Sequence, residues 1–143
     1  GFDVNGNNIW IHDTYIWVQD DCIAIKSHND FPSTDMVFER LTASGIGLSI
    51  GGFSGTKVVG PNITWRNIYM PNTYNGIYIK IIGDAPTVTG VTYENITIEN
   101  ASHWPIWIGP AQQADSDTCV LQWPFTERSL SHCFMPESSI SDI

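Results

Sequence analysis

Two adjacent carboxylates, Asp20 and Asp21, have the clearest capacity for chemistry in this sequence. Hydrolysis of a glycosidic bond requires paired carboxylates, because one protonates the leaving oxygen and the other activates water. The pair directly precedes the apolar run at residues 22–25, so we expect both side chains to project from the start of a strand into a groove. A solvated Asp-Asp turn is the alternative, because two neighbouring Asp residues alone are a weak signal.

Further side chains are expected on the same face as the two carboxylates. If Ile23 and Ile25 point inward, the alternation of a strand directs Lys26 outward, and the same holds for the equivalent strands of later repeats. The residues assigned to this face are Lys26, Tyr78, Lys80 and Trp107. Ammonium groups pair with sugar carboxylates and aromatic rings pack on sugar faces, so the face suits an acidic polysaccharide. An ordinary surface with scattered aromatic residues is the alternative.

A sequence repeat defines the strands that position these residues. Four segments align on Ile11, Phe38, Trp65 and Tyr93, which recur at a nearly constant interval along the chain. Each segment alternates apolar and polar residues, as a strand with one buried face does, and a second short apolar run follows it. The unit is too short for a four-stranded propeller blade. The sequence therefore predicts an all-β fold, a single-stranded solenoid of the right-handed parallel β-helix type.

The second apolar runs should form aliphatic columns inside the solenoid. The inward positions are expected to be Ile23, Ile25, Leu48, Ile50, Ile77, Ile79, Ile106 and Ile108. Residues 1–110 would form about four coils, and residues 111–143 an irregular C-terminal segment that could act as a cap. The first coil begins without a cap, so we expect further coils upstream of this chain.

Composition limits the classes of partner. The formal net charge of −9 excludes a nucleic-acid-binding surface, because no basic stripe is present to neutralise phosphates. No apolar run approaches the roughly 20 residues that span a bilayer. We expect an acidic polysaccharide of the pectin type as the partner, no membrane association, no cofactor or metal, and a monomer.

Cysteines and sequons bear on the compartment. Cys119 and Cys133 enclose a short loop and could form a disulfide in an oxidising compartment, or stay reduced, whereas Cys22 is expected to be a buried thiol. Sequons at Asn62, Asn95 and Asn100 permit N-glycosylation in a secreted protein. Asn95 could instead belong to an interior ladder. An extracellular location is the expectation.

Four motifs occur in order at residues 1–4 (GFDV), 19–25 (QDDCIAI), 44–52 (SGIGLSIGG) and 76–81 (GIYIKI). Together with the repeat they resemble glycoside hydrolase family 28, the polygalacturonase family. This resemblance implies an inverting hydrolase of galacturonate-containing polymers, in which Asp20 and Asp21 are catalytic and Lys80 binds substrate. It also implies a third carboxylate immediately before Gly1.

Departures from the family pattern imply altered subsites. Ile46 stands where the family has a catalytic-site His, and Tyr78 replaces an Arg that could bind a sugar carboxylate bidentately. The chain also resembles the rhamnogalacturonan-hydrolase branch in having a Tyr before the retained Lys, although that branch usually lacks the paired Asp residues. The four histidines do not match the missing position and are expected to be surface or structural residues: His12, His28, His103 and His132.

Two other functions remain open at this stage. Loss of the family His and Arg would suit a non-catalytic β-helix that binds polysaccharide or serves as an adhesion module. A polysaccharide lyase also uses a β-helix, but it would require a calcium-binding carboxylate cluster and a basic residue to abstract a proton.

Overall fold

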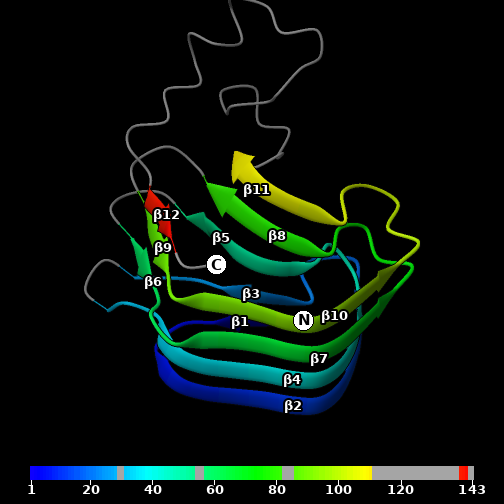
Figure 1. Cartoon of the computed structure of the whole chain (residues 1–143), viewed down its shortest axis with the longest axis horizontal. Helices are drawn as coiled ribbons and strands as arrows, with labels where there is room; N and C mark the ends of the chain where they lie inside the picture. Colours follow the sequence, from blue (N-terminus) through cyan, green and yellow to red (C-terminus); the bar gives the residue numbers. More distant parts are fainter. Residues whose placement is uncertain (29–30, 54–56, 82–85, 111–138, 142–143) are drawn as a thin grey trace, which may run out of the picture.

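The computed structural model describes residues 1–28, 31–53, 57–81, 86–110 and 139–141, and this part of the chain contains strands without helices (Figure 1). The five-stranded sheet contains, in spatial order, β1 (Phe2–Val4), β3 (Ile23–Ile25), β5 (Leu48–Phe53), β8 (Ile77–Ile81) and β11 (Ile106–Pro110). The four-stranded sheet contains β2 (Asn7–Trp17), β4 (Thr34–Ser44), β7 (Ile63–Pro71) and β10 (Val91–Glu99). The third sheet contains β6 (Val58–Val59), β9 (Thr87–Thr89) and β12 (Ser139–Ser141).

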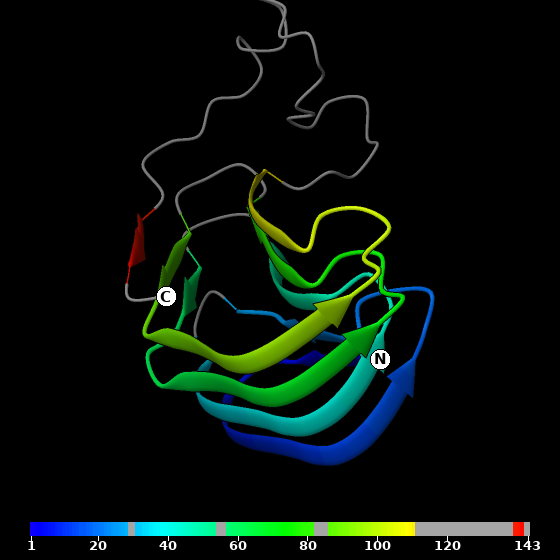
Figure 2. The same ribbon diagram turned by 45° about the vertical axis from the view of Figure 1, so that its right-hand side comes forward.

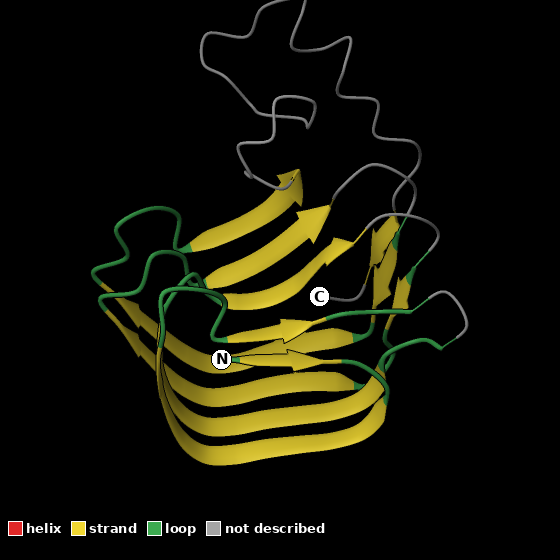
Figure 3. Cartoon of the chain, turned by 180° about the vertical axis from the view of Figure 1, so that it is seen from behind, coloured by secondary structure: helices red, strands yellow, loops and turns green. Residues whose placement is uncertain are grey.

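The chain winds from one sheet to the next and returns to each sheet one strand further along (Figures 2 and 3). Every pairing between named strands is parallel, which confirms the prediction of an all-β parallel β-helix. None of the described segments forms a helix that could cross a membrane.

The four anchor residues of the repeat lie directly above one another. Ile11 pairs with Phe38, Phe38 pairs with Trp65, and Trp65 pairs with Tyr93, so the predicted spacings give the observed register. The Phe38 and Trp65 rings stack with centroids 4.1 Å apart, and the Trp65 and Tyr93 rings with centroids 5.8 Å apart. Aromatic stacking adds to the burial of apolar area, so this column stabilises the contact between coils.

The aliphatic columns also follow the predicted register. Ile23, Leu48 and Ile77 are successive partners in one column, and Ile25, Ile50 and Ile79 form the second. All six side chains are buried.

Ile106 and Ile108 continue the two columns in register, as expected, but they are 58% and 46% exposed. The reason is that β11 is the last strand of its sheet in the described part of the chain, where no further strand covers it.

The long strands of the four-stranded sheet contain a corner that the sequence pattern does not reveal. Asp13, Arg40, Asn67 and Asn95 adopt positive φ angles of 50–55° in the middle of β2, β4, β7 and β10, and the pairing skips each of them. One left-handed residue changes the alternation, so inward side chains such as Phe38 and Leu41 are three positions apart. Strict alternation therefore holds only within each half of these strands.

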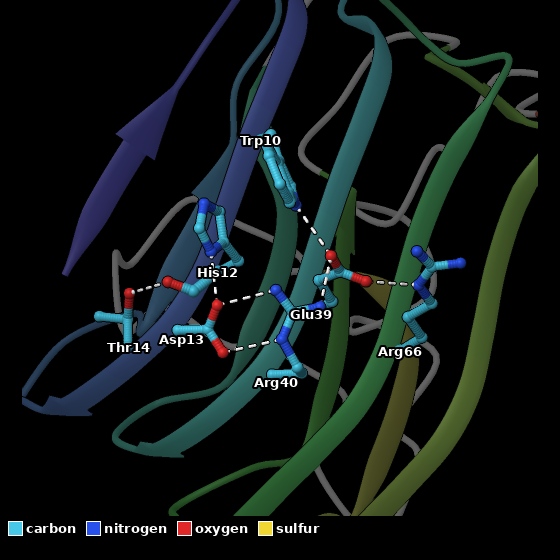
Figure 4. A network of polar contacts seen from close by, with 7 residues as sticks. All are labelled: Trp10, His12, Asp13, Thr14, Glu39, Arg40 and Arg66. Carbon is cyan, nitrogen blue, oxygen red and sulfur yellow. Dashed lines mark hydrogen bonds and ion pairs between the residues drawn. The ribbon is translucent and has the colours of Figure 1, made fainter.

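An outer clamp links three coils on the outside of the four-stranded sheet (Figure 4). We use this name for Trp10, His12, Asp13, Glu39, Arg40 and Arg66. The Arg40 guanidinium donates two hydrogen bonds to the Asp13 carboxylate at 2.7 and 2.8 Å, and it lies 2.6 Å from Glu39 Oε1. Glu39 Oε2 accepts a hydrogen bond from Arg66 Nε at 2.7 Å.

Glu39 is the centre of the clamp. Its Oε1 also accepts a hydrogen bond from Trp10 Nε1 at 3.0 Å. Hydrogen bonds from Arg66 and then Arg40 lower the pKa of the Glu39 carboxyl to about 2. The clamp therefore joins carboxylates and guanidinium groups that come from successive coils.

The predicted C-terminal segment lies almost wholly outside the described residues. This holds for Cys119 and Cys133, so their disulfide stays a prediction, and for His132. Cys22 is a free, buried thiol as expected, and burial raises its pKa to about 11.

Candidate active site

Asp21 is held by side chains from two later coils. Asp21 lies two residues before the start of β3, next to the buried Cys22, and is 9% exposed. Asp21 Oδ2 accepts a hydrogen bond from Lys80 Nζ at 2.6 Å, and Asp21 Oδ1 accepts one from Ser49 Oγ at 2.5 Å. The register of β3, β5 and β8 thus brings together residues that are 59 positions apart in sequence.

Lys80 is almost as buried as its partner, with 5% of the side chain exposed. Its Nζ atom lies 4.9 Å from the centroid of the Tyr78 ring, within the range of a cation–π contact. Gly51 permits the close approach of β5 to Lys80, since a Cβ atom there would lie 2.1 Å from the Lys80 carbonyl oxygen. The φ angle of Gly51 is +95°, which also favours glycine.

Asp20 occupies a different environment from Asp21. The side chain of Asp20 is exposed, and its Oδ1 accepts a hydrogen bond from the Asp21 backbone N–H at 2.7 Å. Of the two neighbouring carboxylates, that of Asp20 is therefore open to solvent, and that of Asp21 is paired with a lysine. Such a difference in environment lets two carboxyl groups take different roles in acid–base chemistry.

A pocket of about 760 Å³ lies next to these residues. Asp20, Tyr78 and Lys80 line it, whereas Asp21 lies behind Lys80 and outside the lining. Aromatic residues from neighbouring coils complete the lining, and they are Trp17, Tyr74, His103 and Trp104. The volume is within the range of sites that enclose a small organic ligand or part of a polymer.

The structure places two predicted substrate-binding residues outside this pocket. Lys26 Nζ donates a hydrogen bond to the Gly51 carbonyl oxygen at 2.9 Å. Trp107 pairs in register with Tyr78 and contacts Trp104, with ring centroids 5.7 Å apart. The pocket lies toward the amino-terminal ends of the strands of the five-stranded sheet, whereas Lys26 follows the carboxyl end of β3 in that sheet.

The turns before β5, β8 and β11 form the side of the pocket that sequence reasoning missed. Tyr74 N–H donates to the Gly45 carbonyl oxygen at 2.7 Å, and His103 N–H donates to the Tyr74 carbonyl oxygen at 2.9 Å. Gly45, Tyr74 and His103 therefore lie in one file across three coils. Their equal spacing in the sequence, one coil from each to the next, is the signal that indicates this file, whereas the absence of a motif at His103 predicts only a surface or structural residue.

Gly45 permits close packing against the preceding coil, where no side chain would fit. A Cβ atom at Gly45 would lie 2.6 Å from the Asp20 carbonyl oxygen and 2.9 Å from Cys22 Sγ. Ile46, which stands at the family's His position, follows it and also lines the pocket. Asn75 N–H donates to the Ile46 carbonyl oxygen at 3.1 Å, so Asn75 occupies the position of the next coil that is equivalent to Ile46.

The three sequon asparagines lie on the outside of the solenoid. Asn62 Nδ2 donates to Asp35 Oδ1 at 2.8 Å, Asn95 Nδ2 donates to Asn67 Oδ1 at 2.8 Å, and Asn100 has the same kind of contact with Asn72. All three are exposed and have positive φ angles. Asn95 thus belongs to a ladder, but to an exterior one.

Among the residues that the structure describes, no group of three or more His, Cys, Asp or Glu side chains could hold a metal ion. The chemistry that this region can support with its own side chains is proton transfer by the Asp20 carboxylate in the pocket and the Asp21 carboxylate beside it, with a lysine and neutral polar or aromatic groups to bind a sugar.

Comparison with known proteins gives the family. The family model for glycosyl hydrolases family 28 matches residues 1–122. An Aspergillus flavus protein named "probable rhamnogalacturonase C" is 30% identical over 121 residues, which cover 85% of this chain and 26% of that protein. An Aspergillus fumigatus "probable endopolygalacturonase" is 34% identical over 110 residues, which cover 75% of this chain and 28% of that protein.

A third relative, "probable rhamnogalacturonase B" of Aspergillus oryzae, is 34% identical over 95 residues, covering 66% of this chain and 17% of that protein. No solved structure gives a significant match. The chain thus spans between 17% and 28% of the length of these relatives. Since the family model matches most of its residues, the chain belongs to glycoside hydrolase family 28.

Proposed function

We propose that the whole protein is a pectin-type polysaccharide hydrolase, which cleaves glycosidic bonds in galacturonate-containing polymers with inversion. The observation that carries this proposal is the divided pair of carboxylates. Asp20 is exposed to the pocket, and Asp21 is held by Lys80 and Ser49 directly beside it. Membership of glycoside hydrolase family 28 supports the same reaction class.

Asp20 suits the role of general acid. Its Oδ1 accepts the Asp21 N–H, so the second carboxyl oxygen can carry the proton for the leaving glycosidic oxygen. Asp21 suits the role of an ionised carboxylate, since an ammonium group and a hydroxyl group donate to its two oxygens. It would orient the attacking water on the other side of the sugar ring.

Lys80 suits the binding of a sugar carboxylate. An ammonium group has three N–H donors, and one of them serves Asp21, so further donors can reach a substrate in the pocket. Tyr78 contributes a ring in place of a second cation. Recognition of an acidic sugar at this point therefore depends on Lys80.

The test uses the full-length secreted protein with pectic polymers as substrates. We expect new saturated reducing ends from the wild type, and none from Asp20→Asn or Asp21→Asn, although circular dichroism shows both variants folded. Near-normal turnover in both variants would contradict the proposed roles. An unsaturated product that absorbs in the ultraviolet would indicate a lyase, and polymer binding without any product would indicate a non-catalytic module.

Secretion and N-glycosylation belong to the same proposal. The exposure of Asn62, Asn95 and Asn100 supports modification, because an oligosaccharide could be attached at each site without entering the core. Expression in a fungal host should give a secreted protein whose mass falls after treatment with an N-glycosidase. Retention of the same mass would argue against glycosylation.

A further inference from the structure

A second pocket, of about 390 Å³, opens on the outside of the four-stranded sheet. We call it the corner groove. Its lining residues are Arg40, Leu41, Thr42, Asn67, Ile68, Tyr69, Asn95 and Thr97. Among the described residues, none lines both the corner groove and the candidate active site. The volume lies at the lower end of the range for small-molecule sites, so the corner groove suits one monosaccharide rather than a stretch of polymer.

Two rows of side chains frame the corner groove. The first row contains corner residues with positive φ angles, and they are Arg40, Asn67 and Asn95. The second row lies two positions further along each strand and pairs in register, and it contains Thr42, Tyr69 and Thr97. Between the rows, the side chains of Leu41 and Ile68 are buried in the core. The strands themselves therefore form the floor of the corner groove.

A possible attachment point for a sugar lies within this lining. Asn95 belongs to the lining and begins a sequon, whereas the sequon residues Asn62 and Asn100 lie outside it. Asn95 Nδ2 donates one hydrogen bond to Asn67 Oδ1 at 2.8 Å. The same nitrogen carries a second N–H, so a sugar can replace that hydrogen without breaking the ladder. A glycan on Asn95 therefore starts at the edge of the corner groove.

Tyr69 offers this sugar an aromatic surface. Its side chain is 41% exposed, and its Oη donates a hydrogen bond to Glu99 Oε2, which holds the ring against β10. Thr42 and Thr97 flank it in the same row and add hydroxyl groups. An apolar face of a pyranose ring or an acetamido methyl group can pack on such a ring, and the hydroxyl groups can bond the sugar's polar atoms.

The charge at the corner groove favours a neutral sugar. Arg40 supplies the cation of the lining, and its guanidinium already contacts the carboxylates of Asp13 and Glu39 (Figure 4). Its positive charge is therefore compensated, so it offers little attraction to a sugar carboxylate. A guanidinium has more N–H donors than these contacts use, and the others can donate to neutral hydroxyl or carbonyl oxygens.

Covalent attachment removes most of the cost of binding. A ligand joined by a short link has a high effective concentration at a site beside its attachment point. It has also lost most of its translational freedom before the contact forms. Contacts that are too weak to capture a free sugar are then sufficient to order a linked one.

We propose that the first N-acetylglucosamine of a glycan on Asn95 occupies the corner groove and packs on Tyr69, so that the sugar joins β10 to β7. This inference rests on the N-glycosylation proposed above and does not depend on the hydrolytic reaction. In the modification, sugar C1 leaves the diphosphate of a lipid-linked donor and bonds to Asn95 Nδ2, which loses one proton. Asn62 serves as the internal comparison, because it lines neither described pocket.

The experiment uses the native full-length protein from a fungal host, treated with an N-glycosidase that leaves Asp at each released site. Peptide mass spectrometry follows release at every sequon over time. Release at Asn95 should be about tenfold slower than at Asn62, because the packed sugar must leave the corner groove before the enzyme reaches the linkage. Tenfold corresponds to the upper range for one aromatic contact. After denaturation in urea, the two sites should be released at similar rates.

Matched variants assign the protection to the ring. Tyr69→Ala should bring release at Asn95 close to the rate at Asn62, and Tyr69→Phe, which keeps the ring, should retain the protection. Tyr15→Ala should change neither rate, because Tyr15 is an exposed tyrosine that pairs with Thr42 in the same row but does not line the corner groove. The wild-type comparison needs no variant, so it decides the proposal even if Tyr69→Ala does not fold.

The outcomes separate this inference from the proposed function. Equal native release at Asn95 and Asn62, an unmodified Asn95, or protection that persists in Tyr69→Ala would each overturn the corner groove as the sugar's site. The absence of a glycan at all three sequons would overturn the proposed N-glycosylation with it. A protected glycan on a protein that releases no reducing ends from pectic polymers would overturn the hydrolase function and leave the corner groove standing.

Discussion

The Asp21–Lys80 pair and the outer clamp are both ionic contacts between coils, but they differ in burial and in number of partners. Asp21 and Lys80 are 9% and 5% exposed, and each is the other's one ion-pair partner among the described residues. In the outer clamp, Arg40 has two carboxylate partners and Glu39 has two guanidinium partners (Figure 4). The Glu39 side chain is buried too, but its arginine partners are 44% and 46% exposed to water.

The difference indicates what each contact is for. Removing one member of a buried pair leaves a charge without compensation, whereas exposed pairs contribute little because water screens them. A repeat fold can join its coils with redundant pairs in which the cation stays partly exposed to water, such as those of the clamp. The buried pair is a costly way to join coils, so its retention at the pocket favours a chemical role. The following predictions test this contrast, from the largest expected effect to the smallest.

Neutralising one carboxylate in each region should separate function from structure. Asp21→Asn in the full-length protein is expected to lower kcat by at least about 100-fold, because acid–base catalysis typically contributes 10²–10⁴-fold. Glu39→Gln is the matched change in the clamp and should keep kcat within a factor of about two, because Glu39 does not line the pocket. Equal losses in the two variants, measured by reducing-end release, would remove the distinction between the regions.

Removing the cation from each region should separate their contributions to stability. Lys80→Met is expected to lower the free energy of unfolding by about 3 kcal/mol, because Asp21 stays buried without its partner. Arg40→Met should shift the urea midpoint far less, since Glu39 retains Arg66. Urea denaturation followed by tryptophan fluorescence measures both. A larger loss in Arg40→Met would reverse our ranking.

Removing both charges of the buried pair sharpens the comparison. The double variant Asp21→Asn/Lys80→Met should recover about 1–3 kcal/mol of the stability lost in Lys80→Met, because no unpaired charge remains. Its activity should stay absent. Additive losses in this double-mutant cycle would show that the two side chains do not interact energetically.

The pH dependence of stability should report the clamp. The pKa of Glu39 is lowered from 4.5 to about 2 in the fold, so its contribution is fully present above pH 4.5 and is lost as pH falls through about 2. Glu39→Gln should therefore reduce the slope of stability against pH between 4.5 and 2, so that the variant is less stable than the wild type at neutral pH and the difference shrinks as pH falls toward 2. Urea midpoints at a series of pH values measure this slope, and an unchanged slope would contradict the shift.

Much of the fold could be predicted because apolar residues recur with a fixed spacing. The spacing of Ile11, Phe38, Trp65 and Tyr93 fixes which residues stack, and the register places Ser49 above Ala24 and below Tyr78. Corners such as Arg40 were not predictable, since left-handed backbone in an arginine has no compositional signal.

The candidate site was predictable only in part. Asp20, Asp21 and Lys80 were selected for their charge and motif, and the pocket lies beside them. Alternation alone predicts that Lys26 points outward, but it cannot reveal that the Gly51 carbonyl oxygen accepts a hydrogen bond from Lys26. His103 matches no motif, so the sequence does not indicate that the backbone hydrogen bonds from Gly45 through Tyr74 to His103 place it at the pocket.

The turns that hold Tyr74 and His103 also show where coils of different length can be accommodated. Along the inner column, the chain from Ile23 to Leu48 is shorter than the chain from Leu48 to Ile77. The corner residues of the four-stranded sheet, in contrast, recur at an almost constant interval, and they are Asp13, Arg40, Asn67 and Asn95. The length therefore varies in the segments between the corners and the inner column, and the turns that frame the pocket are among them. Evolution can therefore redraw the rim of the groove for a new polymer while the stacked interior keeps its register.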